Sequence, residues 1–180
     1  KKDISLAKSI NLSENLIDRI ALDTKRIESI ALSLKNISDL PDPVGELIDS
    51  SLRPNKLVVE RIRIPLGVIG IIYESRPNVT SDAGGLCIKS GNTAILRCGT
   101  ESYNSSLVLM NCLQKGLAHS NLPKECVQLV PTMNREAVGK MLKMHEYINI
   151  LVPRGGKSLV KRVQSESTIP VLSHLEGNCH

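Results

Sequence analysis

Short apolar runs alternate with helical segments over the second half of the chain, and this alternation constrains the fold more than any other feature. The apolar runs lie at residues 67–73, 93–97, 126–130, 148–152 and 169–172. Helical segments are predicted between them, at 81–89, 103–119, 135–144 and 156–165. Strands that alternate with helices form a parallel sheet with right-handed crossovers. The 67–73 run is apolar on both faces, which is typical of a central strand covered by helices on both sides.

The N-terminal third is predicted to contain helices. Apolar residues recur at i, i+3, i+4 and i+7 from Ile27 to Leu34, which indicates one apolar helix face. Thr24 or Asp23 is the expected N-cap, because either side chain can accept from a first-turn amide. The prolines at 41 and 43 end this helix, since proline disfavours helical geometry in the residue before it.

Two further elements complete the N-terminal part. A shorter helix is expected at 13–20, and charged residues within the 57–64 run predict an edge or hairpin strand there. We therefore expect helices and a β-hairpin over residues 1–64, followed by an α/β dinucleotide-binding unit over residues 65–180.

The composition excludes several classes of function. Three Tyr are the only aromatic residues, so an aromatic platform for stacking bases is not expected. The net charge is +5, but the basic residues are scattered and suit a solvated face or a phosphate-bearing small ligand better than nucleic acid. No run of about 18 apolar residues and no signal-peptide pattern occurs, so we expect no membrane or secretory role.

The cysteines and histidines do not have the spacing of a metal site. The five cysteines are Cys87, Cys98, Cys112, Cys126 and Cys179. They form no CxxC pair, which is typical of reduced thiols in a cytoplasmic protein. Cys87 and Cys126 lie among aliphatic residues and are expected to be small core residues. The four histidines also lack ligand spacing, so no metal is expected.

The first candidate ligand-binding segment follows the predicted 148–152 strand, since ligands bind beyond the carboxyl ends of the strands in an open parallel sheet. Its residues are Arg154, Gly155, Gly156, Lys157 and Ser158. Two glycines let the backbone approach a ligand, and the next helix offers unpaired amides and a positive dipole end. A plain turn explains the same residues. A nucleotide-triphosphatase loop does not, because the glycine required five residues before Gly156 is Leu151.

The second candidate segment follows the 93–97 strand. Arg97 stands at the strand tip, and Arg can hold a phosphate by two parallel hydrogen bonds. The uncharged Thr100 can donate to a ribose 2′-phosphate, which a carboxylate at that position would repel. If the chain binds a nicotinamide nucleotide, these two residues favour NADPH over NADH. The alternative is that Arg97 pairs with Glu101 on the surface.

The third candidate segment, 74–80, follows the 67–73 strand. Asn78 could donate an amide N–H to a developing oxyanion. Equally, Asn78 could cap the helix that follows, and helix caps are the commoner role for asparagine.

Taken together, these segments resemble one family. Residues 65–80, PLGVIGIIYESRPNVT, resemble the signature of the γ-glutamyl phosphate reductases, also called glutamate-5-semialdehyde dehydrogenases, of the aldehyde dehydrogenase superfamily. Further matches in register are KSGN at 89–92, ILR at 95–97, VQLVP at 127–131, PRGGK at 153–157, LPDPVG at 40–45 and RPN at 53–55. The resemblance covers nearly the whole chain, from about residue 11 to residue 180.

The resemblance implies an aldehyde dehydrogenase-like fold and the NADPH-dependent reduction of γ-glutamyl phosphate to glutamate-5-semialdehyde in proline biosynthesis. In that chemistry a cysteine thiolate displaces phosphate, and hydride then reduces the thioester. The family's hairpin serves oligomerisation, so a homo-oligomer is expected.

Three departures from the family pattern affect these expectations. The opening helical stretch is missing, and Cys98 stands where glycine is usual, which leaves open how it affects cofactor binding. The chain stops at residues 176–180, before the segment of the nucleophilic cysteine, and Cys179 matches an upstream motif instead. We therefore expect the cofactor-binding part of a reductase that is inactive alone. The alternatives are a non-catalytic remnant that acts as a binding module, or the ordered part of a longer, active enzyme.

Overall fold

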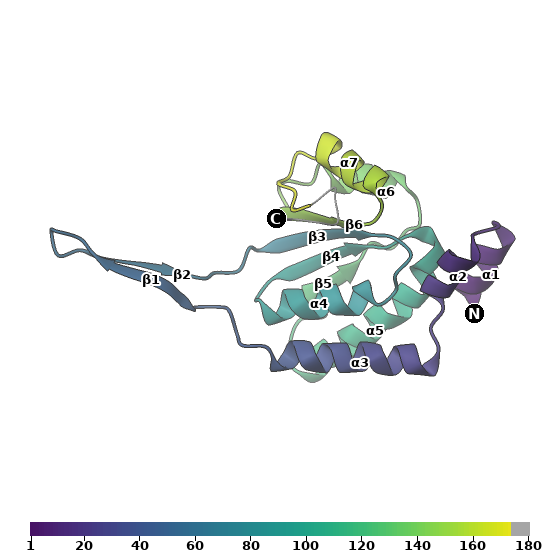
Figure 1. The fold of residues 1–180 in the computed structure, drawn as a ribbon, viewed down its shortest axis with the longest axis horizontal. Coiled ribbons are helices and arrows are strands. Elements are labelled where there is room, and N and C mark those ends of the chain that lie inside the picture. The colour runs from purple at the N-terminus through teal and green to yellow at the C-terminus, as the bar shows by residue number, and fades with distance from the viewer. Residues whose placement is uncertain (174–180) are drawn as a thin grey trace.

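The computed structural model describes residues 1–173 and shows a parallel four-stranded sheet with helices on both faces (Figure 1). The strands are β3 (Val68–Tyr73), β4 (Thr93–Arg97), β5 (Val127–Leu129) and β6 (Ile150–Arg154). Their order in the sheet is β5-β4-β3-β6, and every pair is parallel. The α/β class predicted from the alternating pattern is confirmed.

Strand β3 is central, as its apolar sequence predicts. Ile71 pairs with Leu96 of β4 on one side and with Val152 of β6 on the other. All but the first of its residues are buried, because helices cover both faces of the sheet.

The helices divide between the two faces and enclose two apolar clusters. On one face lie α4 (Val79–Lys89) and α5 (Tyr103–His119), which pack on β3, β4 and β5. On the other face lie α6 (Glu136–Met141) and α7 (Lys157–Glu166), which pack on β3 and β6. Single turns of 3₁₀ helix, η1 (Thr100–Ser102) and η2 (Lys124–Cys126), precede α5 and β5.

Three helices precede the sheet: α1 (Lys2–Ser9), α2 (Glu14–Ile20) and α3 (Thr24–Asp39). Asp23 caps α3 as predicted, since its carboxylate accepts from the Arg26 amide at 2.7 Å. Helix α3 lies outside α4 and adds a further layer on that face (Figure 1).

Helix α1 was not predicted, and a buried carboxylate holds it in place. Asp3 accepts from the Asn104 amide at 3.1 Å and from the Ser105 amide at 2.7 Å, in the first turn of α5. A carboxylate is favourable at the positive end of a helix, so this contact docks α1.

A two-stranded hairpin of β1 (Leu47–Leu52) and β2 (Val58–Ile62) projects from the body of the molecule (Figure 1). The hairpin strand expected at 57–64 is therefore confirmed. Apolar side chains such as Leu52 and Ile62 are exposed on it.

Several predicted boundaries were wrong near the C-terminal end of the described chain. The strand expected at 148–152 lies at 150–154, because pairing of Ile69 with Ile150 sets its start. The run at 169–172 forms only an isolated bridge between Leu151 and Val171. Pro170 lies within that run and has no N–H to donate, which limits ladder formation. The helix expected at 135–144 ends at Met141.

Gly70 in β3 provides a test of core packing. A Cβ added there would lie 2.6 Å from Leu151 Cδ2 and 2.8 Å from Met141 Cε. We expect Gly70→Ala to lower the free energy of unfolding by about 1–3 kcal/mol in urea titrations, because overpacking forces side chains to shift. Gly116→Ala is the matched control, since no atom lies within 4 Å of the added Cβ. An equal effect of the two substitutions would contradict the packing described for β3.

Candidate functional site

The carboxyl ends of strands β3 and β4 open into one cavity of about 350 Å³. Glu74 and Ser75 line it from the end of β3, and Arg97 and Thr100 line it from the end of β4. Helix α7 contributes Ser158. Arg135 and Arg162 add positive charge to the walls. Three of the residues predicted to bind cofactor therefore share one cavity, namely Arg97, Thr100 and Ser158.

Arg97 is 6% exposed, and its guanidinium turns toward backbone carbonyls beyond β4. It donates to the carbonyl of Cys98, to that of Met133 at 3.2 Å and to that of Asn134 at 3.4 Å. Its Nε is buried and has no partner within the part of the chain that the structure describes. A buried donor without a partner suits a ligand oxygen in the adjoining cavity.

Glu101 binds Ser75 and not Arg97 in the described structure. Its carboxylate accepts from the Ser75 amide at 2.9 Å and from the Ser75 hydroxyl at 2.6 Å. These contacts join the ends of β3 and β4. The alternative in which Glu101 pairs with Arg97 on the surface was wrong, because Arg97 is buried and Glu101 is engaged elsewhere.

The glycine turn after β6 lies against the carboxylate of Glu74. The Gly156 amide, at the N-terminus of α7, donates to Glu74 Oε2 at 2.9 Å. A Cβ added at Gly155 would lie 2.6 Å from the same oxygen. An acidic side chain of the protein therefore occupies the position where a helix N-terminus receives an anion.

The remaining predicted cofactor residues lie around this turn. Arg154 is the last residue of β6, not part of the loop, and Lys157 begins α7. Arg154, Gly155 and Gly156 line a second cavity of about 250 Å³, of which Glu74 also forms a wall. The predicted residues thus divide between two adjoining cavities.

The role of Glu74 was missed in the sequence analysis. Tyr73 pairs with Arg154, so the residues that follow these two strands lie side by side. The sequence does place Glu74 directly after a central strand, where ligand-binding residues are expected. Its contact with the glycine turn could be inferred only once β6 was known to pair with β3.

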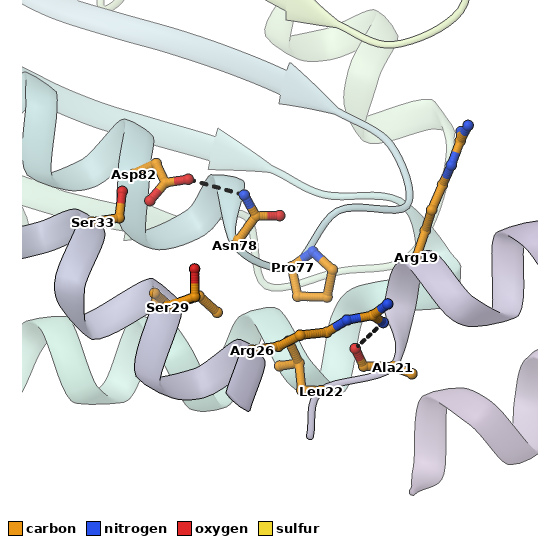
Figure 2. A pocket seen from close by; sticks show the side chains of 10 residues that line it. Arg19, Ala21, Leu22, Arg26, Ser29, Ser33, Pro77, Asn78 and Asp82 are labelled. Atoms are coloured by element: carbon orange, nitrogen blue, oxygen red, sulfur yellow. Dashed lines mark hydrogen bonds between the residues drawn. The ribbon is translucent and has the colours of Figure 1, made fainter. Parts of the chain in front are cut away.

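Asn78 occupies the N-cap position of α4, but its side chain makes no capping hydrogen bond. Its Nδ2 instead donates to Asp82 Oδ2 at 2.9 Å. The prediction of a capping position is confirmed, whereas a capping side chain was wrong. Asn78 lines a third cavity, of about 260 Å³, together with Pro77 and Asp82 (Figure 2).

Burial disfavours the thiolate form of two cysteines near the sheet. Burial raises the pKa of Cys87 to about 11 and also raises the pKa of Cys98, which lies at the tip of β4. Cys126 is partly buried and packs against the core, as expected, and Cys112 is exposed on α5. Cys179 lies outside the described residues.

Residues 1–173 contain neither a candidate metal site nor a candidate membrane span. No three His, Cys, Asp or Glu side chains gather there in a way that could hold a metal ion. No helix in this range is both long and apolar enough to cross a bilayer.

Known proteins are similar to this chain in sequence and in architecture. The chain is 53% identical to the γ-glutamyl phosphate reductase of Rhodospirillum rubrum over 179 residues, which is 99% of this chain and 42% of that protein. The crystal structure of γ-glutamyl phosphate reductase from Thermotoga maritima superposes with a TM-score of 0.93 at 40% identity, over 99% of this chain and 43% of that one. The crystal structure of γ-glutamyl phosphate reductase from Saccharomyces cerevisiae superposes with a TM-score of 0.85 at 33% identity, over 97% of this chain and 45% of that one.

The chain therefore spans about 42% of the length of the curated relatives that it matches. The aldehyde dehydrogenase family matches residues 18–179, which include the sheet, both sets of covering helices and the hairpin. This chain therefore belongs to the aldehyde dehydrogenase family, and its near relatives within that family are γ-glutamyl phosphate reductases.

Proposed function

We propose that this chain is the cofactor-binding part of an enzyme that reduces γ-glutamyl phosphate to glutamate-5-semialdehyde with NADPH, in proline biosynthesis. The cavity that joins Arg97, Thr100 and Ser158 at the strand tips carries the proposal. The names of the relatives support the substrate, and the cationic walls support a phosphate-bearing cofactor. A cytoplasmic location is part of the proposal, because widely spaced cysteines are typical of reduced thiols.

Each predicted residue has a role in this proposal. The amides of Gly155, Gly156 and Lys157 bind the diphosphate at the N-terminus of α7, with Arg154 and Ser158 beside it. Arg97 and Thr100 bind the ribose 2′-phosphate by charged and hydroxyl hydrogen bonds. NADPH supplies the hydride when bound. Asn78 donates to the acyl oxygen, and the nucleophilic thiolate belongs to a segment that this chain does not include.

The proposal also covers assembly and domain organisation. Residues 65–180 form the dinucleotide-binding domain, and residues 1–64 contribute the helices and the hairpin. Exposed apolar side chains on the projecting hairpin, Leu52 and Ile62 among them, suit a homo-oligomer in which the hairpin contacts a second copy. The same hairpin supports the second candidate function, a non-catalytic interaction module.

Direct titration with reduced nucleotides tests the cofactor assignment. We expect NADPH to bind the 180-residue chain more tightly than NADH, as followed by nucleotide fluorescence. Equal affinities, or binding of neither nucleotide, would favour the interaction module.

Glu74→Gln is expected to raise the affinity for NADPH. The Glu74 carboxylate holds the Gly156 amide and repels an incoming diphosphate, so removal of its charge favours the bound state. We expect a gain of about three- to tenfold, equivalent to about 0.7–1.4 kcal/mol. Glu60→Gln, on the exposed hairpin strand β2, is the control for a general change of charge. An unchanged or lower affinity in Glu74→Gln alone would show that the carboxylate does not compete with the cofactor.

A further inference from the structure

A small polar cavity adjoins Asn78 and Asp82 (Figure 2). Its volume is about 260 Å³, just below the roughly 300–1,000 Å³ of cavities that hold drug-sized ligands. Its walls come from α3, from the turn before α3 and from the start of α4. The size suits a ligand about as large as an amino acid.

Asp82 supplies the negative charge of this cavity. One carboxylate oxygen, Oδ2, accepts from Asn78 Nδ2 at 2.9 Å. The other, Oδ1, is buried and has no hydrogen-bond partner within the described residues. A buried carboxylate oxygen requires a donor, and a carboxylate can only accept. The missing partner is therefore a hydrogen-bond donor, and a cationic one would be favoured.

The two arginines that line the cavity do not supply that cation. Arg26 is engaged by the Asp18 carboxylate at 2.8 Å and by the Ala21 carbonyl at 2.9 Å. The Arg19 side chain extends away from Asp82 (Figure 2). A ligand ammonium, which has three donors on a compact charge, fits the space beside Asp82.

Donors for an anionic group lie elsewhere in the same cavity. The hydroxyls of Ser29 and Ser33 come from α3, which faces the start of α4 (Figure 2). These groups suit a carboxylate, so the cavity offers partners for both charged groups of an amino acid.

We propose that this cavity binds the α-amino acid end of the substrate, with Asp82 on the ammonium and the hydroxyls of Ser29 and Ser33 on the carboxylate. The inference rests on the proposed function, in which Asn78 donates to the acyl oxygen. Asn78 and Asp82 are neighbours at i and i+4, where side chains stand about 5–6 Å apart at Cβ. Two methylenes separate the acyl carbon of a γ-glutamyl group from its α-carbon, so an extended group places its acyl oxygen and its ammonium about 5–6 Å apart. Hydrogen bonds of about 2.9 Å at each end let one such group contact both side chains.

Asp82 is therefore a specificity-determining residue. It selects an acyl group that carries an ammonium two methylenes away, and it orients the Asn78 amide through the hydrogen bond of 2.9 Å. A simple aliphatic acyl group of the same length would leave Oδ1 without a partner, and a buried group left unpaired lowers affinity.

Calorimetric titration with L-glutamate and with glutarate, which lacks the ammonium, tests the assignment on the 180-residue chain. We expect the chain to bind L-glutamate at least about tenfold more tightly than glutarate, as a charged hydrogen bond predicts. In Asp82→Asn the ratio of the two affinities should fall close to one. Asp49→Asn, the same change on the exposed hairpin, should keep the ratio of the unchanged chain.

Two further measurements guard against a variant that does not fold and separate this proposal from the proposed cofactor site. If Asp82→Asn does not fold, the ligand pair is compared on the unchanged chain, with the NMR signal of the Asn78 side-chain amide as the readout. That signal should shift more with L-glutamate than with glutarate. NADPH titration of the same variants separates the two proposals, because Asp82→Asn should retain its NADPH affinity. Equal affinity for both acids, binding of neither, or a ratio that survives in Asp82→Asn would overturn the assignment, whatever the NADPH result.

Discussion

Assayed alone, the 180-residue chain is expected to give no oxidation of glutamate-5-semialdehyde in the presence of phosphate and NADP. The proposed chemistry requires a thiolate beside the substrate acyl carbon. Burial raises the pKa of Cys87 to about 11, which disfavours its thiolate at pH 7. Burial also raises the pKa of Cys98. Cys112 is exposed on α5, away from the strand tips.

The reaction is followed by the absorbance of the NADPH that it would form, measured with and without phosphate. A parallel NADPH titration shows that the protein in the assay is folded and competent to bind. Cys179 lies outside the described residues, so its role is tested by substitution. Phosphate-dependent turnover that disappears in Cys179→Ser would make Cys179 the nucleophile and would reverse this prediction.

Arg97→Ala is expected to weaken NADPH binding by about 10- to 100-fold while NADH binding stays nearly unchanged. A charged hydrogen bond contributes about 1.5–3 kcal/mol, and each 1.4 kcal/mol corresponds to about tenfold in affinity. The guanidinium is 6% exposed and its Nε has no partner among the described residues, so a phosphate oxygen would add to its contacts. Fluorescence titration of both nucleotides measures the two losses.

The contacts of Arg97 with the carbonyls of Met133 and Asn134 require a control for stability. Truncation leaves these acceptors without their donor, so the folded fraction is determined by circular dichroism before each titration. Arg97→Lys keeps the charge but loses the planar fork, and an intermediate affinity for NADPH is expected. Equal losses for NADPH and NADH would reject the assignment of Arg97 to the 2′-phosphate.

Local sequence determined much of this fold. The bounds of β4 (Thr93–Arg97) and α5 (Tyr103–His119) agree with their predictions, and Asp23 caps α3 as expected. These features depend on hydrophobic periodicity and on hydrogen bonds between residues a few positions apart. Helix α1 was missed because tertiary contacts of Asp3 hold it, 101 and 102 residues away along the chain.

The sequence alone also located the ends of the strands. It thereby located the residues predicted to bind cofactor, which are Arg97, Thr100 and the glycine turn. It did not determine which strand tips are neighbours, because pairing depends on contacts between distant segments. Only the tertiary structure placed β6 beside β3, which brings Glu74 onto the Gly156 amide across 82 residues of chain. The folding of α3 against α4 likewise encloses the cavity beside Asp82, whose unpaired oxygen only the packed structure shows.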